Sequence, residues 1–317
     1  MLPLALLFQL LVALRRRLYQ NGFLRSDRLP LPVVVVGNIT VGGSGKTPLI
    51  FWLLQQLRKR GLQPGVVSRG HGGSGRLCEV FPGSDATEVG DEPLLLKRRA
   101  QLPVFVGKDR VAAARALIKA HPECDLILSD DGLQHYRLKR DFEIAVQDGR
   151  GLMNGWPLPA GPLREPPSRL ACVDALVING AGGDLLPDTP TLPPRFDMLL
   201  VGDTFHALAD PRQTCAAKNL AGLRLAAVAG IGDPQRFFVH LEGLGLSFAP
   251  HPFPDHHRFS AADFSGIDAD ALLMTEKDAV KCAGLTDRPV WVLPVTAQVF
   301  PDLAALIMEK LNGCPPA

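Results

Sequence analysis

The segment GNITVGGSGKTP at residues 37–48 ends in Gly-Lys-Thr, as loops that bind nucleotide phosphates do. It lies between a strand-like run, VVVVG at 33–37, and a helical pattern at 49–61. Backbone N–H groups of such a turn curl round an anion, and the positive end of the following helix strengthens the binding. The candidate nucleotide contacts are Thr40, Val41, Gly42, Gly43, Ser44, Gly45, Lys46 and Thr47.

Two side chains carry the most specific chemistry of this loop. Lys46 is expected to reach the β- and γ-phosphates, and the Thr47 hydroxyl is expected to ligate Mg²⁺. Thr40 stands where the full pattern has its first glycine. That position is a strand exit, where any allowed backbone conformation suffices, while Gly42 and Gly43 leave the loop interior open to phosphate. We therefore predict a working phosphate loop.

Two acidic residues follow a buried strand further along the chain. The run LILSD at 126–130 is mostly apolar, and Asp130 and Asp131 stand at its end. Mg²⁺ takes oxygen ligands and keeps several waters, so a carboxylate at a strand end beside a phosphate loop can hold it directly or through water. We expect Asp130 and Asp131 to serve the metal, Asp130 above all. The alternative is a turn that happens to begin with Asp-Asp-Gly.

Two further segments offer acid–base chemistry. VGDEP at 89–93 places Asp91 and Glu92 before a helix, where Asp91 is either an N-cap or a general base that accepts a hydroxyl proton. HPFPDHHRF at 251–259 gathers three histidines with an aspartate. The adjacent His256 and His257 cannot face the same way on a strand, so one of them at most is expected in a site. These residues have structural explanations as well, and the pattern leaves both open.

The elements around these motifs predict an α/β fold of the P-loop NTPase type, a parallel sheet with helices on both faces. Apolar runs alternate with helical patterns such as 49–61 and 109–121. Pro- and Gly-rich segments at 152–167 and 181–194 interrupt the series. The apolar runs lie at 33–37, 65–68, 103–106, 126–130, 143–146, 175–179, 197–201, 225–229, 271–275 and 291–294.

The domain division follows from the same series. We place an N-terminal membrane-associating helix at 1–28, a P-loop domain at 29–219 and a smaller C-terminal α/β domain at 220–317. The N-terminal segment is apolar from 2 to 14 apart from one glutamine, and three arginines follow at 15–17. A secretory signal has its charge before the apolar run instead. A helix of these thirteen residues is too short to span a bilayer, so we expect a helix in an anionic membrane interface; the alternative is a core helix.

Composition narrows the class of protein. The 317 residues are 46% hydrophobic and 21% charged, which suits a globular chain with a sizeable core. A net charge of +2 gives no global basic field for nucleic acid. Six cysteines without a CxxC pair indicate a reducing compartment and argue against a disulfide framework or a structural zinc site.

In combination and order, these motifs resemble the tetraacyldisaccharide 4′-kinase family of lipid A biosynthesis. The resemblance implies ATP- and Mg²⁺-dependent phosphorylation of the 4′-hydroxyl of a tetraacylated glucosamine disaccharide 1-phosphate. It also implies an enzyme held at the cytoplasmic face of the inner membrane, and it suggests no obligate protein partner. The matching stretches are residues 33–48, SRGHGG at 68–73, VGDEPLLL at 89–96, SDDGLQHYRLKRD at 129–141, LPAGPLREP at 158–166, AGIGDPQRFF at 229–238, FPDHHRF at 253–259 and TEKDAVK at 275–281.

The resemblance also implies roles for single residues. Asp91 is the base, and a histidine of the Asp-His-His motif pairs with it; we choose His256 over His257. Lys46 acts on the phosphates in the transfer step. Gln134, His135, Arg164 and Glu165, together with Glu92, match family positions near the site, with their separate roles open.

Two rival functions remain at this stage. A membrane-associated NTPase could hydrolyse its nucleotide to drive a partner, although TEKD at 275–278 lacks the Asn-Lys-x-Asp spacing usual for guanine recognition. A lipid-binding scaffold without catalysis would have no need of Lys46, Thr47 and Asp130 together.

Overall fold

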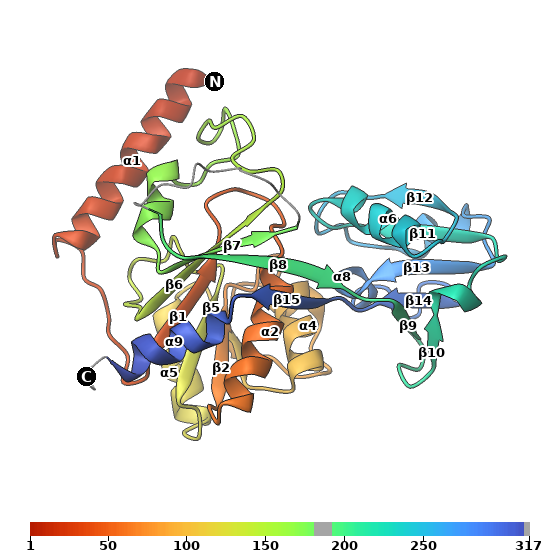
Figure 1. Cartoon of the computed structure of the whole chain (residues 1–317), viewed down its shortest axis with the longest axis horizontal. Coiled ribbons are helices and arrows are strands. Elements are labelled where there is room, and N and C mark those ends of the chain that lie inside the picture. The colour runs from red at the N-terminus through yellow and green to blue at the C-terminus, as the bar shows by residue number, and fades with distance from the viewer. Residues whose placement is uncertain (181–191, 314–317) are drawn as a thin grey trace.

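The computed structural model of the chain describes residues 1–180 and 192–313 and places them in two sheets (Figure 1). The predicted loop at 181–194 lies mostly outside the described residues. The helices are α1 (Leu2–Gln20), α2 (Lys46–Lys59), α3 (Ala86–Val89), α4 (Asp91–Ala100), α5 (Arg110–Ala120), α6 (Pro234–Gly243), α7 (Ala261–Ser265), α8 (Glu276–Ala279) and α9 (Leu303–Asn312), with 3₁₀ turns at Pro167–Cys172 and Ala217–Asn219.

The large sheet has the strand order β15-β8-β7-β6-β1-β5-β2-β4-β3. Every pairing from β8 to β4 is parallel, and the two edge strands are antiparallel. This confirms the predicted P-loop type of α/β fold. The strands are β1 (Val33–Gly37), β2 (Pro64–Ser68), β3 (Cys78–Glu79), β4 (Val104–Val106), β5 (Leu126–Asp130), β6 (Phe142–Asp148), β7 (Ala175–Asn179), β8 (Arg195–Val201) and β15 (Thr296–Phe300).

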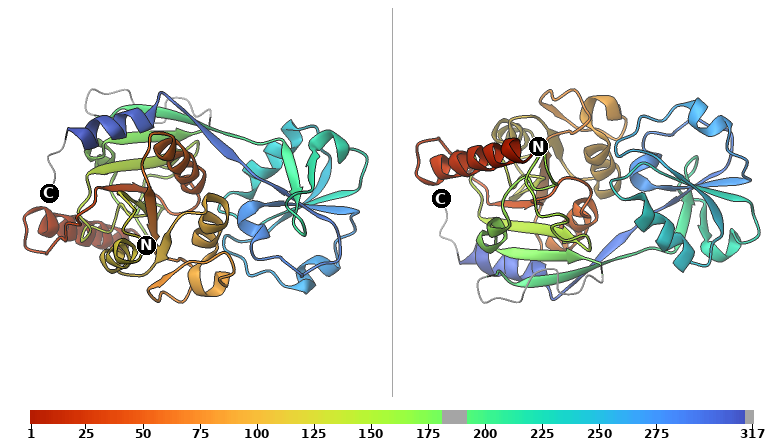
Figure 2. Two further views of the ribbon diagram at one scale, coloured as in Figure 1. Left: turned by 90° about the horizontal axis from the view of Figure 1, so that it is seen from below. Right: turned by 90° about the horizontal axis from the view of Figure 1, so that it is seen from above.

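The core of this sheet follows the two-residue repeat of strands. Val34 and Val36 pack with α2, α4 and α9 on one face, whereas Val33 and Val35 pack with α5 on the other. Both faces of the sheet are therefore buried, which explains why the central strands do not alternate between apolar and polar residues. Figure 2 shows the helices on the two sides of the sheet.

The small sheet has the strand order β10-β9-β14-β13-β11-β12. α6 packs on one face of it, and α7 and α8 pack on the other. Its strands are β9 (Thr204–Ala207), β10 (Thr214–Ala216), β11 (Leu225–Ala229), β12 (Phe248–Pro252), β13 (Ala271–Thr275) and β14 (Val290–Leu293).

The sheets correct the domain boundary drawn at 220. Strands β9 and β10 precede that residue yet belong to the small sheet, and β15 and α9 follow it yet belong to the large one. The chain thus crosses between the sheets twice, after β8 and after β14 (Figure 1). The reason is physical: β15 pairs along β8 and buries Ala297 and Val299 in the large core, a long-range pairing that a local pattern does not encode.

Helix α1 stands beside the large domain and hardly contributes to its core (Figure 1). Ala5 is its only buried residue. Its exposed apolar side chains include Leu2, Leu4, Leu6, Leu7, Leu10, Leu11 and Leu14. The alternative of an ordinary core helix therefore does not hold. Across residues 1–180 and 192–313, no helix combines the length and the hydropathy that crossing a bilayer requires.

Candidate active site

The phosphate loop leaves the central strand β1 and runs into α2. Gly45, the N-cap of α2, has φ 92°, a left-handed conformation that suits glycine. A Cβ at Gly45 would lie 2.1 Å from the Asn179 side-chain nitrogen, which itself donates to the Ser44 carbonyl at 3.0 Å. Thr40 does not have a positive φ and is buried, so the missing first glycine costs nothing at this position.

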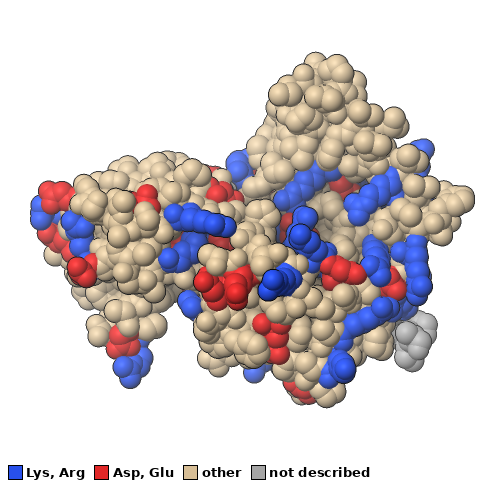
Figure 3. Space-filling model, turned by 180° about the vertical axis from the view of Figure 1, so that it is seen from behind, with Lys and Arg blue, Asp and Glu red and all other residues tan. Residues whose placement is uncertain are grey.

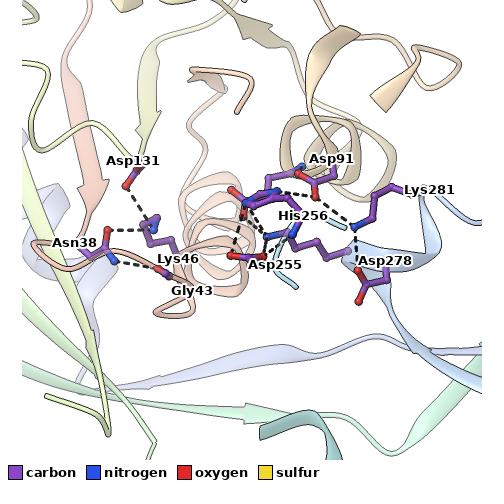
Figure 4. Close-up of polar contacts among 12 residues, drawn as sticks. Asn38, Gly43, Lys46, Asp91, Asp131, Asp255, His256, Asp278 and Lys281 are labelled. Atoms are coloured by element: carbon purple, nitrogen blue, oxygen red, sulfur yellow. Dashed lines mark hydrogen bonds and ion pairs between the residues drawn. The ribbon is translucent and has the colours of Figure 1, made fainter. Parts of the chain in front are cut away.

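The side chain of Lys46 lies at the carboxyl ends of two neighbouring strands. Its Nζ donates to Asn38 Oδ1 at 3.2 Å and lies 3.5 Å from Asp131 Oδ1 (Figure 4). Asp131 also receives Arg164 Nη1 at 2.8 Å. Burial alone would raise the pKa of Asp131, but Lys46 and Arg164 outweigh it and hold the pKa below the ordinary range. Asp131 therefore stays ionised and fixes two cations at the loop.

Asp130 has different surroundings from its neighbour. It is 2% exposed, and its register partner on β1 is Val36, immediately before the phosphate loop. Ser68 Oγ donates to one carboxylate oxygen at 3.0 Å, while the other, Oδ1, is buried without a hydrogen-bond partner. Burial, reinforced by Glu92 and Asp131, raises the pKa of Asp130 well above its usual value. A buried carboxylate oxygen without a partner is suited to a cation.

A divalent metal would need more than protein ligands here. Within the described part of the chain, no group of three or more His, Cys, Asp or Glu side chains is arranged to hold a metal ion. Mg²⁺ commonly uses one or two protein oxygens together with nucleotide phosphates and waters. Asp130 and the Thr47 hydroxyl fit that donor set, because Thr47 is in the first turn of α2 and lines the adjoining cleft.

Asp91 and His256 come from different domains and meet at the junction. His256 Nδ1 lies 3.0 Å from Asp91 Oδ2 (Figure 4). The N-cap of α4 is Gly90, so Asp91 is not the cap; its Oδ1 accepts from the adjacent Glu92 amide at 2.9 Å. His256 has φ 59°, unusual for a residue with a side chain and typical of functional sites.

The charges around this pair set its ionisation. Burial works to raise the pKa of Asp91, yet the hydrogen bond from His256 and the charges of Lys277 and Lys281 leave it lowered. The hydrogen bond to Asp91 raises the pKa of His256 against burial and Lys277. Asp91 is therefore a carboxylate at neutral pH, able to accept a proton.

His257 lies in another environment. Its Nε2 is 3.4 Å from Asp263, and its ring stacks near Phe253 with centroids 4.7 Å apart. The structure thus brings His256 and not His257 to Asp91. Glu92 lies beside the pair, with Oε1 3.0 Å from Lys277 Nζ.

The remaining family-motif residues form a group on the other side of the phosphate loop. Gln134 Nε2 donates to Glu165 Oε1 at 2.7 Å and to the Asn38 carbonyl at 3.0 Å. Glu165 also accepts from the Tyr136 hydroxyl. Burial lowers the pKa of His135 to about 4, so this imidazole is neutral, and its Nε2 is buried without a partner.

A cleft of about 670 Å³ lies between the two domains. The phosphate loop from Gly43 to Pro48 lines one side, and residues 231–233, 235–237 and 275–277 of the small domain line the other. The two sides approach closely, since a Cβ at Gly232 would come within 2.5 Å of the Gly43 amide nitrogen. Volume and position suit a nucleotide held by both domains.

Sequence reasoning missed several residues of this site. Asn38 and Asn179 stand at strand ends and fix the loop through hydrogen bonds, and Lys277 contacts the Asp91–His256 region. A polar residue at the end of an apolar strand was the available signal for the two asparagines. The spacing did not point to Lys277, because its partners Glu92, Asp255 and His256 lie in other segments of the chain.

A phosphate loop after the central strand, with an acidic residue at the end of the neighbouring strand, defines a P-loop nucleotide-binding α/β protein. The family described as LpxK, tetraacyldisaccharide-1-P 4′-kinase, matches residues 1–312. The chain belongs to this family, which confirms the resemblance, and it is a phosphotransferase, a lipid A 4′-kinase.

The individual comparisons are consistent with one another. A tetraacyldisaccharide 4′-kinase of Azoarcus sp. (strain BH72) is 56% identical over 322 residues, covering 99% of this chain and 92% of the relative. That of Dechloromonas aromatica (strain RCB) is 54% identical, with coverage of 99% and 92%. A crystal structure of LpxK from Aquifex aeolicus in complex with ATP has a TM-score of 0.79 at 28% identity, covering 98% of both chains.

Proposed function

We propose that this chain binds ATP in the cleft between its domains and transfers the γ-phosphoryl group to the 4′-hydroxyl of a tetraacylated disaccharide 1-phosphate. The observation that carries the proposal is the Asp91–His256 pair, which lies beside the cleft that the phosphate loop lines. An enzyme that only bound nucleotide would have no use for a paired base there. A positioned carboxylate next to a transferable phosphoryl group suits a hydroxyl acceptor.

The proposed roles follow from the contacts. Lys46 and the loop amides bind the β- and γ-phosphates. Asp91 accepts the proton of the attacking hydroxyl, and His256 positions the Asp91 carboxylate through its Nδ1 contact. Mg²⁺, when bound, neutralises charge on the phosphates. Asp130 and Thr47 would hold it, whereas Asp131, already paired with Lys46 and Arg164, would orient those two cations.

We place the enzyme at an anionic membrane surface, the cytoplasmic face of the inner membrane. The exposed leucines of α1 support this proposal, and so does the uncharged projection in Figure 3, below which Lys and Arg side chains gather. Near the end of α1, the Arg15 guanidinium lies 5.6 Å from the centre of the Tyr136 ring. The helix end is thereby tied to the motif that carries Gln134 and His135.

The test is a transfer assay with the full chain in detergent micelles. ATP, Mg²⁺ and the dispersed disaccharide 1-phosphate are supplied, and the lipid is analysed by mass spectrometry. The proposal expects a product heavier by one phosphoryl group, formed in step with ADP. ATP consumption with an unchanged lipid mass would favour the NTPase instead.

A matched pair of lysines on α2 makes the assay specific. Lys46→Met removes the phosphate-loop ammonium and is expected to lower transfer by at least about a hundredfold. Lys59→Met changes an exposed lysine in the last turn of the same helix and is expected to leave transfer unaltered. Equal activities of the two variants would contradict the assignment of the loop.

A further inference from the structure

Lys277, in the motif TEKDAVK, has no part in the roles assigned so far. It belongs to α8 of the small domain, and its side chain is only 15% exposed. Its Nζ lies 3.0 Å from Glu92 Oε1, 3.0 Å from Asp255 Oδ1 and 3.4 Å from His256 Nε2. The ammonium group therefore contacts the second ring nitrogen of His256, the one that does not bind Asp91.

The donors of the Lys277 ammonium determine the direction of its hydrogen bond with His256. A lysine ammonium has three N–H donors and no acceptor. The two carboxylates and the ring nitrogen give it three partners, so His256 Nε2 has to present its lone pair. Burial lowers the pKa of Lys277, but Glu92, Asp91 and Asp255 more than offset this and raise it, so the donor stays charged.

We propose that Lys277 is a positioning residue that holds His256 as the neutral tautomer protonated on Nδ1. The Nδ1–H then donates to Asp91 Oδ2 across 3.0 Å and orients the carboxylate. This inference rests on the proposed roles of Asp91 and His256 as the base and its partner.

The neutral ring matters for the transfer step. As the 4′-oxygen forms its bond to the γ-phosphorus, the bond from phosphorus to ADP breaks and ADP takes the electron pair. The 4′-hydroxyl proton passes to Asp91. An imidazolium beside Asp91 would stabilise the carboxylate and make it a weaker proton acceptor. A neutral ring still orients Asp91 without lowering its basicity in this way.

Several groups face the His256 ring, and their charges oppose one another. Asp91 on α4 and Asp255, whose Oδ2 is 3.8 Å from Nε2, favour protonation of the ring. The His71 ring lies 4.8 Å away, centre to centre. Lys277 is in direct contact with the ring and opposes a second proton on it, although the hydrogen bond to Asp91 leaves the pKa of His256 raised overall. Because Lys277 reaches from the small domain to Glu92 of the large one, this control exists only while the domains are together.

The first test measures the tautomer in the unaltered protein. The full chain is labelled with ¹⁵N-histidine, and the ring nitrogens of His256 are assigned by comparison with a His256→Asn sample. At a pH above the raised pKa of His256, where the ring is neutral, we expect Nδ1 to carry the proton and Nε2 to carry none. A proton on Nε2 would overturn the proposal. The measurement needs no substrate or turnover, so a failure here is distinct from a failure of the kinase assignment.

The second test is the pH profile of kcat/KM for transfer. Lys277→Met removes the opposing charge, so His256 should protonate more readily and the acidic limb should move up by about one pH unit. Lys277→Arg, which keeps the charge and donors, should restore the limb. Arg99→Met breaks another interdomain ion pair, with Glu276 at 2.6 Å, without touching His256, and should leave the limb in place. If Lys277→Met lowered kcat/KM by the same factor at every pH, Lys277 would only bridge the two domains, and the proposal would be overturned.

Discussion

Replacing Asp91 by asparagine tests the proposed base most sharply. Asparagine keeps the shape of the side chain but has no charge and no useful basicity. The two hydrogen bonds at Asp91 go to different oxygens, from the Glu92 amide to Oδ1 at 2.9 Å and from His256 to Oδ2 at 3.0 Å, so asparagine, with a single side-chain oxygen, replaces only one of these acceptors. Leaving one buried donor without a partner costs about 1–3 kcal/mol of the free energy of unfolding, which a domain of this size tolerates.

The catalytic loss should be larger than the structural one. Losing a general base lowers kcat by about 10²–10⁴-fold, or roughly 3–5 kcal/mol in the activation free energy. ATP affinity should stay within about twofold, because Asp91 starts α4 and the phosphates bind the loop before α2. Initial rates of lipid phosphorylation and titration calorimetry with ATP measure the two effects separately.

A matched control makes the same substitution elsewhere in the large domain. Asp85 caps α3 by accepting from the Thr87 amide at 2.8 Å and lies on the surface, away from His256. Asp85→Asn should keep kcat within about twofold, because asparagine is also a good N-cap. If Asp91→Asn turned over as fast as Asp85→Asn, the carboxylate would be structural and the reasoning from the domain junction would be refuted.

Three other variants test the metal, the membrane helix and the loop. Asp130→Asn should abolish Mg²⁺-dependent transfer yet raise the Tm measured without Mg²⁺. The pKa of Asp130 is higher in the folded than in the unfolded chain, so its ionisation at neutral pH opposes folding. A lower Tm of the variant would contradict this sign. Leu7→Glu with Leu11→Glu in α1 should reduce binding to anionic vesicles at least about tenfold, since a buried leucine contributes about 1.5–3 kcal/mol; unchanged flotation would place the membrane contact elsewhere. Gly45→Ala should weaken ATP binding by more than about tenfold because its Cβ would collide with Asn179, and calorimetry showing wild-type affinity would contradict the loop geometry.

The sequence predicted the large sheet well because its signals are local. The buried strands are largely apolar runs, the phosphate loop follows β1 directly, and Asp130 is the last residue of β5. Residues at the ends of neighbouring parallel strands meet without any knowledge of the rest of the fold. That part of the site was therefore within reach of pattern reasoning.

The contacts at the domain junction could not be predicted from local sequence patterns in the same way. The contact of Asp91 with His256 joins residues 165 positions apart, and Lys277 is 185 positions from Glu92 (277 − 92). The family resemblance suggested the Asp91–His256 pair, but the spacing could not. The sequence assigned β15 to the wrong domain for the same reason. A short alternating strand carries no signal for the sheet that it joins.

The central claim is that the γ-phosphoryl group passes directly from ATP to the lipid hydroxyl. The most direct measurement supplies ATP labelled with ¹⁸O on the γ-phosphoryl oxygens and follows the label in the lipid by mass spectrometry. We predict that the new 4′-phosphate retains all of the labelled γ-oxygens and that free labelled phosphate forms much more slowly. Labelled inorganic phosphate released in step with ATP consumption, with no label in the lipid, would contradict the account.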